Sequence, residues 1–251
     1  WPLSHHHSPE EFLGALKQAM MAASPVTLLF LARFSGLTAA TLVLSWPLLP
    51  TSSLTSHLSS ATTNDVVYAA LHPLLMVIGF ILVGGEAIMV HAWWPGSRRS
   101  RKSVHLFLQG VAFACGLVGL LSKFQGKEGL FGNFLSLHSW MGVLCFVLFA
   151  VQWFVGVWSF WHRGEGRRTR AKVLPWHVFF GLYTYGLAVA TAETGLLEKL
   201  TIFHSTRITR RTESVIINSL GLCLVFLCGI VVFVVVSPKH RFFNGRVNET
   251  C

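Results

Sequence analysis

The sequence predicts an all-α, polytopic membrane protein with six transmembrane helices. Hydrophobic residues make up 53% of the 251 residues and charged residues only 12%, whereas charged residues form about a quarter of a typical soluble domain. The apolar residues gather in six long stretches, and about 20 apolar residues are enough for one helix to cross the hydrocarbon. Backbone hydrogen bonding in lipid favours helices over open sheets. The alternating pattern of a membrane β-barrel is absent from the sequence.

Six apolar stretches account for most of the chain. They span residues 26–49, 72–94, 105–122, 138–161, 177–196 and 215–237. We therefore expect one transmembrane domain over residues 26–238, with an N-terminal cytosolic or interfacial segment (1–25) before it and a C-terminal cytosolic tail (239–251) after it. Within the N-terminal segment, Ser8 as an N-cap, Pro9 at the first helical position and the acidic Glu10 predict a short interfacial helix.

The basic residues are divided unequally among the connections between spans. The formal net charge of +10 raises the question of nucleic-acid binding, but no soluble domain remains to present these charges. Lys and Arg cluster after the second, fourth and sixth spans, whereas none lies between the first two spans. The positive-inside rule places these clusters and both termini in the cytosol. The expected location is an endomembrane or the plasma membrane, with no nucleic-acid partner.

Four histidines recur at the N-terminal edges of predicted spans. These are His72, His105, His138 and His177, separated by 33, 33 and 39 residues along the chain. Because consecutive spans run in opposite directions, His72 and His138 are expected near the non-cytosolic face. The same reasoning places His105 and His177 near the cytosolic face. The other histidines near spans or in loops show no comparable pairing and are expected at interfaces or in loops: His57, His91, His162, His204 and His240.

One pair of imidazoles at each face suits a haem that carries electrons. Neutral imidazole is the commonest metal ligand among side chains, and a haem iron held at its axial positions by protein ligands is a typical electron carrier. A helix of about 20 residues is roughly 30 Å long, so two macrocycles, one inside each face, come close enough for electrons to cross the bilayer. The sequence predicts four axial ligands and two b haems per chain.

Two other interpretations of the histidines remain open. Intramembrane His and Glu side chains also mark ion routes, so the chain is alternatively a histidine-lined metal-ion transporter. A second alternative is a haem-binding membrane sensor or subunit that passes electrons to no soluble acceptor.

Five short motifs surround these histidines. In order, they are HPLLMVIG from His72, KSVH ending at His105, LHSW around His138, LPWH ending at His177 and GLLEKL from Gly195. Together they closely resemble the transmembrane cytochrome b561 family, most of all its plant members, over about residues 71–238. The resemblance implies a six-helix homodimer with two b haems inside the four central helices. It also implies an ascorbate-dependent ferrireductase type of activity, with electrons passing from cytosolic ascorbate to non-cytosolic monodehydroascorbate or a ferric chelate.

The resemblance implies a basic ascorbate site at the cytosolic face. Family members carry a basic residue seven positions before, and a lysine three positions before, the third-span histidine; here these are Arg98 and Lys102. An arginine seven positions before the fifth-span histidine is Arg170 here. Cations from two converging connections would steer and orient an acidic donor.

The opposite face departs from the family pattern. Gly126 and Leu135 stand where many members have a histidine and a tyrosine, so the resemblance does not carry the family's outer substrate site over to this chain. The candidates for recruiting an anionic chelate are Lys123, Lys127, His204 and the basic cluster at 207–211. A solvated loop is an equally consistent interpretation.

A few further residues are candidates for contacts with the haems. Arg33 in the first span either pairs with a propionate of the cytosolic haem or extends its charge to the interface, and intramembrane Glu86 has no assigned role. Asn133, Ser136 and Glu198 match family positions near the edge of the outer haem. Packing and loop capping are alternatives for these three residues.

Overall fold

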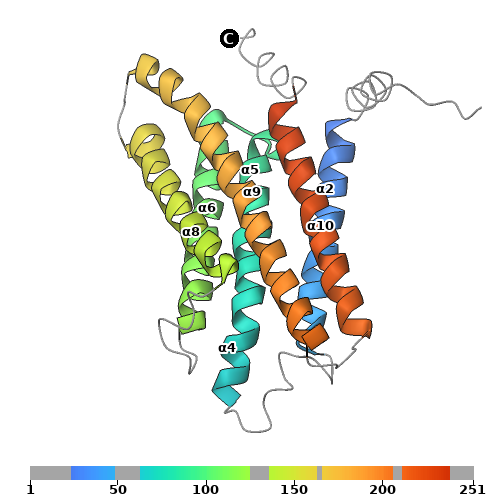
Figure 1. Ribbon diagram of the computed structural model, residues 1–251. Coiled ribbons are helices and arrows are strands. Elements are labelled where there is room, and N and C mark those ends of the chain that lie inside the picture. Colours follow the sequence, from blue (N-terminus) through green and yellow to red (C-terminus); the bar gives the residue numbers. More distant parts are fainter. Residues whose placement is uncertain (1–23, 49–62, 125–135, 163–165, 206–210, 238–251) are drawn as a thin grey trace, which may run out of the picture.

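A computed structural model of the chain describes residues 24–48, 63–124, 136–162, 166–205 and 211–237. These residues form helices and no strand. The part of the chain that is described contains six segments long and apolar enough to cross a membrane, and they run side by side in alternating directions (Figure 1). The predicted fold class is confirmed. The expected interfacial helix and C-terminal tail lie outside the described residues.

The six spans follow one another as continuous helices. The first span is α2 (Pro25–Ser45). The second consists of α4 (Thr63–Leu74), the π-helical η2 (Leu75–Leu82) and α5 (Val83–Trp93). The third is α6 (Arg98–Phe124), and the fourth is α8 (Leu137–Gly156) continued by η3 (Val157–His162). The fifth and sixth are α9 (Arg167–Ser205) and α10 (Arg211–Val236).

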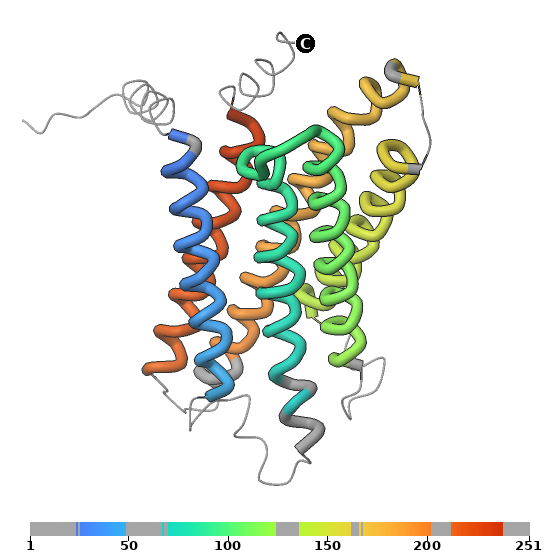
Figure 2. Tube along the Cα trace, turned by 180° about the vertical axis from the view of Figure 1, so that it is seen from behind, coloured from blue at the N-terminus to red at the C-terminus, as the bar shows by residue number. Residues whose placement is uncertain are grey.

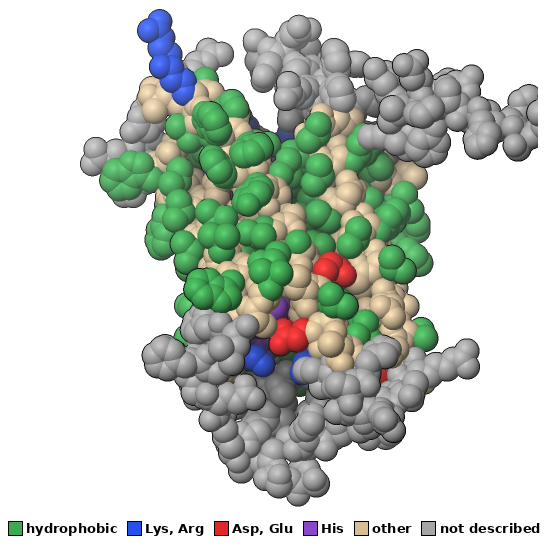
Figure 3. Space-filling view, in the orientation of Figure 1, with side chains coloured by type: hydrophobic (Ala, Val, Ile, Leu, Met, Phe, Trp, Pro, Cys, Tyr) green, Lys and Arg blue, Asp and Glu red, His purple; other side chains and the backbone are tan. Residues whose placement is uncertain are grey.

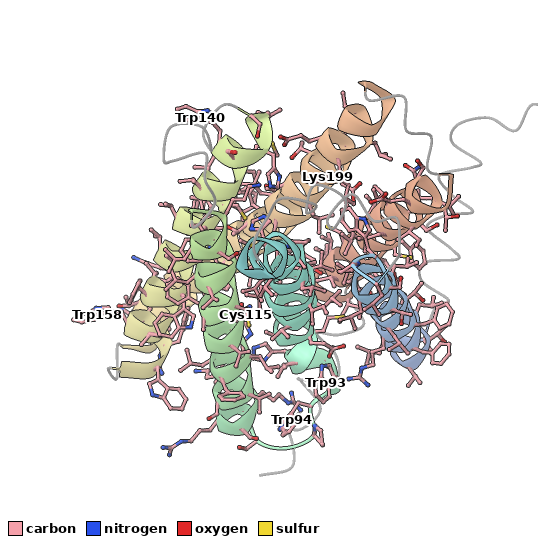
Figure 4. The ribbon with its side chains drawn as sticks, turned by 90° about the horizontal axis from the view of Figure 1, so that it is seen from below. Trp93, Trp94, Cys115, Trp140, Trp158 and Lys199 are labelled. Atoms are coloured by element: carbon pink, nitrogen blue, oxygen red, sulfur yellow. The ribbon has the colours of Figure 1, made fainter. Side chains whose placement is uncertain are left out.

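The second span lies at the centre of the bundle. It packs against α2, α6, α9 and α10, and Figure 4 shows it surrounded by these helices when the molecule is seen from one end. Helices α2 and α10 pack against each other on one side, and α8 and α9 on the other (Figure 2). The second span therefore contributes the buried core residues Val77, Phe80 and Ile81.

The helix of the second span changes its geometry just after the first candidate ligand. Pro73 has no amide hydrogen to complete the helical ladder, and the turns of η2 that follow it are π-helical, a geometry that often accompanies functional sites. Within η2, a Cβ added at Gly79 would collide with Cys115 of α6. The small residue thus lets these two helices approach closely, as is common in membrane bundles.

Two helices at the basic end begin earlier than the apolar stretches that they contain. Helices α6 and α9 begin at Arg98 and Arg167, well before His105 and His177. The helices continue through the basic segments because long Lys and Arg side chains can extend from a helix to water. The start of α2 and the end of α10 lie at this same end of the bundle (Figure 1).

The flank of the bundle is apolar. Large hydrophobic side chains such as Phe30, Phe179 and Leu222 are 66%, 57% and 74% exposed. Figure 3 shows hydrophobic side chains over the middle of the molecule and Lys or Arg towards its ends. A continuous apolar belt of this size fits lipid rather than water as its surroundings. The protein is therefore a multi-pass integral membrane protein.

Candidate functional site

The four candidate ligands form two pairs near opposite ends of the bundle. The ring centres of His72 on α4 and His138 on α8 are 6.1 Å apart, with the ring planes at 85°. The ring centres of His105 on α6 and His177 on α9 are 6.4 Å apart, with the planes at 72°. The structure thus brings together the same two pairs that span direction indicates.

Three of the four imidazoles donate a hydrogen bond to a carbonyl of a neighbouring helix. The Nδ1 atoms of His72, His105 and His138 lie 2.7, 2.7 and 2.8 Å from the carbonyl oxygens of Gly119, Ala87 and Thr191. A carbonyl can only accept, so Nδ1 carries the ring proton and the lone pair on Nε2 stays free. Such a bond orients a metal-ligating histidine and sets its tautomer.

His177 is held in a different way. Its Nδ1 atom is buried without a hydrogen-bond partner among the described residues. Its ring instead packs against Phe160, with ring centres 5.3 Å apart, and the side-chain amide of Gln152 donates to its carbonyl oxygen at 3.4 Å. Packing rather than a hydrogen bond therefore orients this ring.

Two glycines, one on α8 and one on α9, each leave space for the histidine ring of the other helix. A Cβ added at Gly195 of α9 would lie 2.8 Å from Cε1 of His138, and one at Gly156 of α8 would lie 3.0 Å from Cε1 of His177. Each glycine lies 18 residues after the histidine on its own helix. Because 18 residues are about five helical turns, a histidine and its glycine face the same neighbouring helix. The sequence analysis missed this role, although the equal spacing was a usable signal.

A cavity lies beside the His72–His138 pair. Its lining comes from the second span, α6, α8 and α9, and is mostly apolar, with Met76, Phe80 and Phe146 among the contributors. Lys123, at the end of α6, is its charged lining residue. Figure 3 shows histidine atoms towards the lower end of the molecule, next to charged side chains. An apolar cavity with charge at one edge suits a flat, amphipathic ligand.

The three predicted ascorbate-binding cations lie near one another. Lys102 is close enough to Arg98 and to Arg170 for their charges to repel. Arg98 and Lys102 lie two turns and one turn before His105 on α6, and Arg170 lies two turns before His177 on α9. In the described part of the chain none of the three forms an ion pair with a carboxylate. This end of the bundle therefore presents uncompensated positive charge beside the His105–His177 pair.

Known proteins similar to this chain identify its family. The sequence matches the family described as eukaryotic cytochrome b561 over residues 71–204. A protein named probable transmembrane ascorbate ferrireductase 4, from Arabidopsis thaliana, is 54% identical over 221 residues, which cover 87% of this chain and 89% of the relative. The chain belongs to the cytochrome b561 family.

Two further relatives of this cytochrome b561 carry related names. Transmembrane ascorbate ferrireductase 2 of Arabidopsis thaliana is 40% identical, over 82% of this chain and 89% of the relative. Ascorbate-specific transmembrane electron transporter 1 of Zea mays is 37% identical, over 86% of this chain and 90% of the relative. The predicted family, with its resemblance to plant members, is confirmed.

Membership of the cytochrome b561 family implies haem b, and both histidine pairs fit this cofactor. Bonds of about 2 Å from one metal to two opposite imidazole nitrogens put the ring centres roughly 6 to 6.5 Å apart. Both observed separations, 6.1 and 6.4 Å, lie in this range. Among the described residues no group of three or more His, Cys, Asp or Glu could hold a metal ion. Each pair offers the two imidazoles that one haem needs.

Arg33 contacts protein groups inside the membrane. Its Nε atom lies 3.4 Å from Oε1 of Glu86, and its guanidinium lies over the ring of Trp93, 4.7 Å from the ring centre. Trp93 and Trp94 lie together at the end of α5, whereas Trp140 and Trp158 point outwards (Figure 4). The ion pair provides the partner that intramembrane charges require. Pairing of Arg33 with a haem propionate stays a prediction.

Two of the three candidates at the outer haem edge, Ser136 and Glu198, lie within the described residues. Ser136 is the N-cap of α8, and its hydroxyl accepts from the Ser139 amide. This contact supports the capping alternative. Glu198 is exposed on α9, while Asn133 lies outside the described residues. The described residues also exclude Gly126, Leu135, Lys127 and residues 207–210. The expectations about the outer substrate site and chelate recruitment at these positions therefore stay predictions.

The reciprocal glycines generate a selective prediction. Gly195→Ala should remove or distort the haem bound by His138, and Gly156→Ala the haem bound by His177, because the added methyl group overlaps the ring, a type of overpacking that costs about 1–3 kcal/mol. Absorption spectra and haem content of the purified variants check this. Gly186→Ala is the matched control on α9, since nothing lies within 4 Å of an added Cβ there. Unchanged spectra and haem content in all three variants would contradict the role of the glycines.

Proposed function

We propose that this protein is a transmembrane oxidoreductase that carries electrons from cytosolic ascorbate, through two b haems, to a non-cytosolic acceptor. The acceptor is monodehydroascorbate or a ferric chelate. The observation that carries the proposal is the pair of imidazoles at each end of one bundle, with unpaired cations beside one pair. The names of relatives as ascorbate ferrireductases and an ascorbate-specific electron transporter support the choice of donor.

The donor reaction releases one electron and one proton. An ascorbate monoanion that loses both becomes the monodehydroascorbate radical anion. On the other side, one electron converts a ferric chelate into a ferrous chelate, or one electron and one proton convert monodehydroascorbate into ascorbate. When bound, haem b supplies the one-electron chemistry, which these side chains do not provide themselves.

The protein's own side chains would bind the haems, orient the ligand rings and exclude water. His105 and His177 would hold the cytosolic haem, and His72 and His138 the outer one. The Nδ1 hydrogen bonds hold three of these rings in position, and rigid orientation of ligands is what a fast carrier requires. The apolar wall around the outer pair keeps water from the metal site. The expected homodimer is a separate part of this proposal, implied by the family resemblance.

The orientation in the membrane follows from charge. The N-terminal turns of α6 and α9 carry the cations Arg98, Lys102 and Arg170. The positive-inside rule assigns this basic end of the bundle to the cytosol. Both termini then face the cytosol. The same cations would concentrate an anionic donor at the cytosolic pair.

The cytosolic cations generate the first functional prediction. The double variant Lys102→Ala with Arg170→Ala should slow haem reduction by ascorbate about tenfold or more at low salt, since steering by charge changes association rates by factors of that order. Haem content should stay normal, because neither residue is a ligand. Stopped-flow absorption at two ionic strengths measures the rates, and the defect should shrink at high salt. Ascorbate kinetics equal to those of the wild type would assign these residues to membrane topology alone.

The outer face generates the second prediction. Lys123 lines the outer cavity, so Lys123→Ala should reduce electron transfer to anionic ferric chelates about three- to tenfold and leave neutral chelates nearly unaffected, because only an anion gains from the charge. The assay uses vesicles loaded with ascorbate on the cytosolic side and chelates outside. The neutral chelate is the internal control for haem content and coupling. Equal losses with both kinds of chelate would show that Lys123 supports the haem site instead.

A further inference from the structure

His91 lies beside the cytosolic histidine pair, although its sequence position indicates no partner. Its ring centre is 5.4 Å from that of His105, and the two planes are inclined by 39°. His91 follows Ala87 by four residues, and the Ala87 carbonyl accepts the hydrogen bond from His105. Both positions therefore lie on the face of α5 that meets α6, with His91 one turn closer to the cytosolic end.

The same ring adjoins the basic cluster. His91 is within electrostatic reach of Arg98, Arg101 and Lys102 as well as His105. These three cations precede His105 by three to seven residues on α6, which is the spacing of one helix face. The imidazole of His91 thus lies near both the candidate haem ligand and the charges that would attract the donor.

The connection between α5 and α6 holds this arrangement in place. The indole nitrogen of Trp94 donates to the Ser100 hydroxyl at 3.0 Å, and Nε of Arg101 donates to the Trp94 carbonyl at 3.2 Å. Gly96 has φ +117°, a backbone conformation open to glycine, and this permits the tight turn. Because Arg101 bonds the turn itself, Arg98 and Lys102 are the cations left to face a ligand.

The ring nitrogens of His91 are available to hydrogen-bond a ligand. The side chain is exposed, and within the described part of the chain neither of its ring nitrogens has a hydrogen-bond partner. A neutral imidazole presents one donor and one acceptor. The ene-diol edge of an ascorbate monoanion presents a hydroxyl next to a negatively charged oxygen, which match an acceptor and a donor respectively.

We infer that His91 is a further ascorbate-binding residue, which hydrogen-bonds the ene-diol oxygens of the donor between the Arg98–Lys102 charges and the His105–His177 pair. This inference rests on the proposed function and refines its donor site. The cations attract any small anion, whereas His91 selects and orients one that carries adjacent hydroxyl and oxyanion groups. Specificity for a hydroxyl-bearing substrate arises from such paired groups more than from charge.

Two substitutions at the same position separate hydrogen bonding from packing. His91→Phe keeps an aromatic ring against His105 but cannot hydrogen-bond, while His91→Gln keeps one donor and one acceptor in its side-chain amide. Full-length protein with its haems is reduced by increasing concentrations of ascorbate in a stopped-flow instrument. Dithionite, which needs no oriented site, serves as the control reductant.

The expected result is a defect in binding. His91→Phe should raise the half-saturating ascorbate concentration about three- to tenfold, the loss expected for one or two hydrogen bonds, and His91→Gln should raise it less. Spectra and dithionite reduction should match the wild type. Unlike the defect of Lys102→Ala, the defect of His91→Phe should persist at high salt, because no charge is removed.

Other results would overturn the inference in distinguishable ways. If ascorbate reduces the wild type and the half-saturating concentration is unchanged in His91→Phe, His91 is not part of the donor site. The proposed function would still stand. An altered cytosolic haem spectrum in both variants would assign His91 to packing on His105. A wild-type protein whose haems ascorbate fails to reduce would overturn the proposed function itself.

Discussion

Inside a bilayer, an imidazole N–H is stabilised when the protein supplies an acceptor, and for three of the four candidate ligands this acceptor is a helix carbonyl. The fourth, His177, is held by packing against Phe160 instead. His72, His105 and His138 each donate to a carbonyl of the adjacent helix. Two of the acceptor residues, Gly119 and Ala87, have minimal side chains, so their carbonyls are open to a neighbouring ring. Each bond fixes the tautomer, frees Nε2 for a metal and joins one helix to the next. Ligand geometry and helix packing therefore depend on the same contacts.

Two groups of charged residues differ in their depth and in their pairing. Arg33 and Glu86 lie within the spans and neutralise each other, as intramembrane charges require. At the basic end, Arg98, Lys102 and Arg170 remain without carboxylate partners among the described residues, where the backbone reaches water and an anion can compensate them. The first group joins α2 to the second span, whereas the second group is available for a substrate. This difference in pairing supports assigning the donor to the basic end.

Hydropathy and spacing predicted the six spans and both histidine pairs, because the length of apolar runs and the alternation of direction are properties of the sequence itself. They did not reveal that α6 and α9 extend through their basic segments, since a hydropathy profile ends a span where charge begins. They also gave His91 no role: its neighbour His105 lies on another helix, and contact between α5 and α6 is a tertiary property. The reciprocal glycines were overlooked because each acts on a ring that is far away in sequence. Residues 125–135, which hold Gly126, Leu135 and Asn133, lie outside the described part of the chain.

The central claim is that each histidine pair holds one haem, and it is tested most directly by counting haems in purified protein. The wild type should contain two low-spin, six-coordinate b haems per chain, as judged by its absorption spectrum and haem-to-protein ratio, because two opposed imidazoles fill both axial positions of each iron. His105→Ala and His138→Ala should each remove a different haem and leave the other spectrum intact. A single haem in the wild type, or two intact low-spin haems in either variant, would contradict the account.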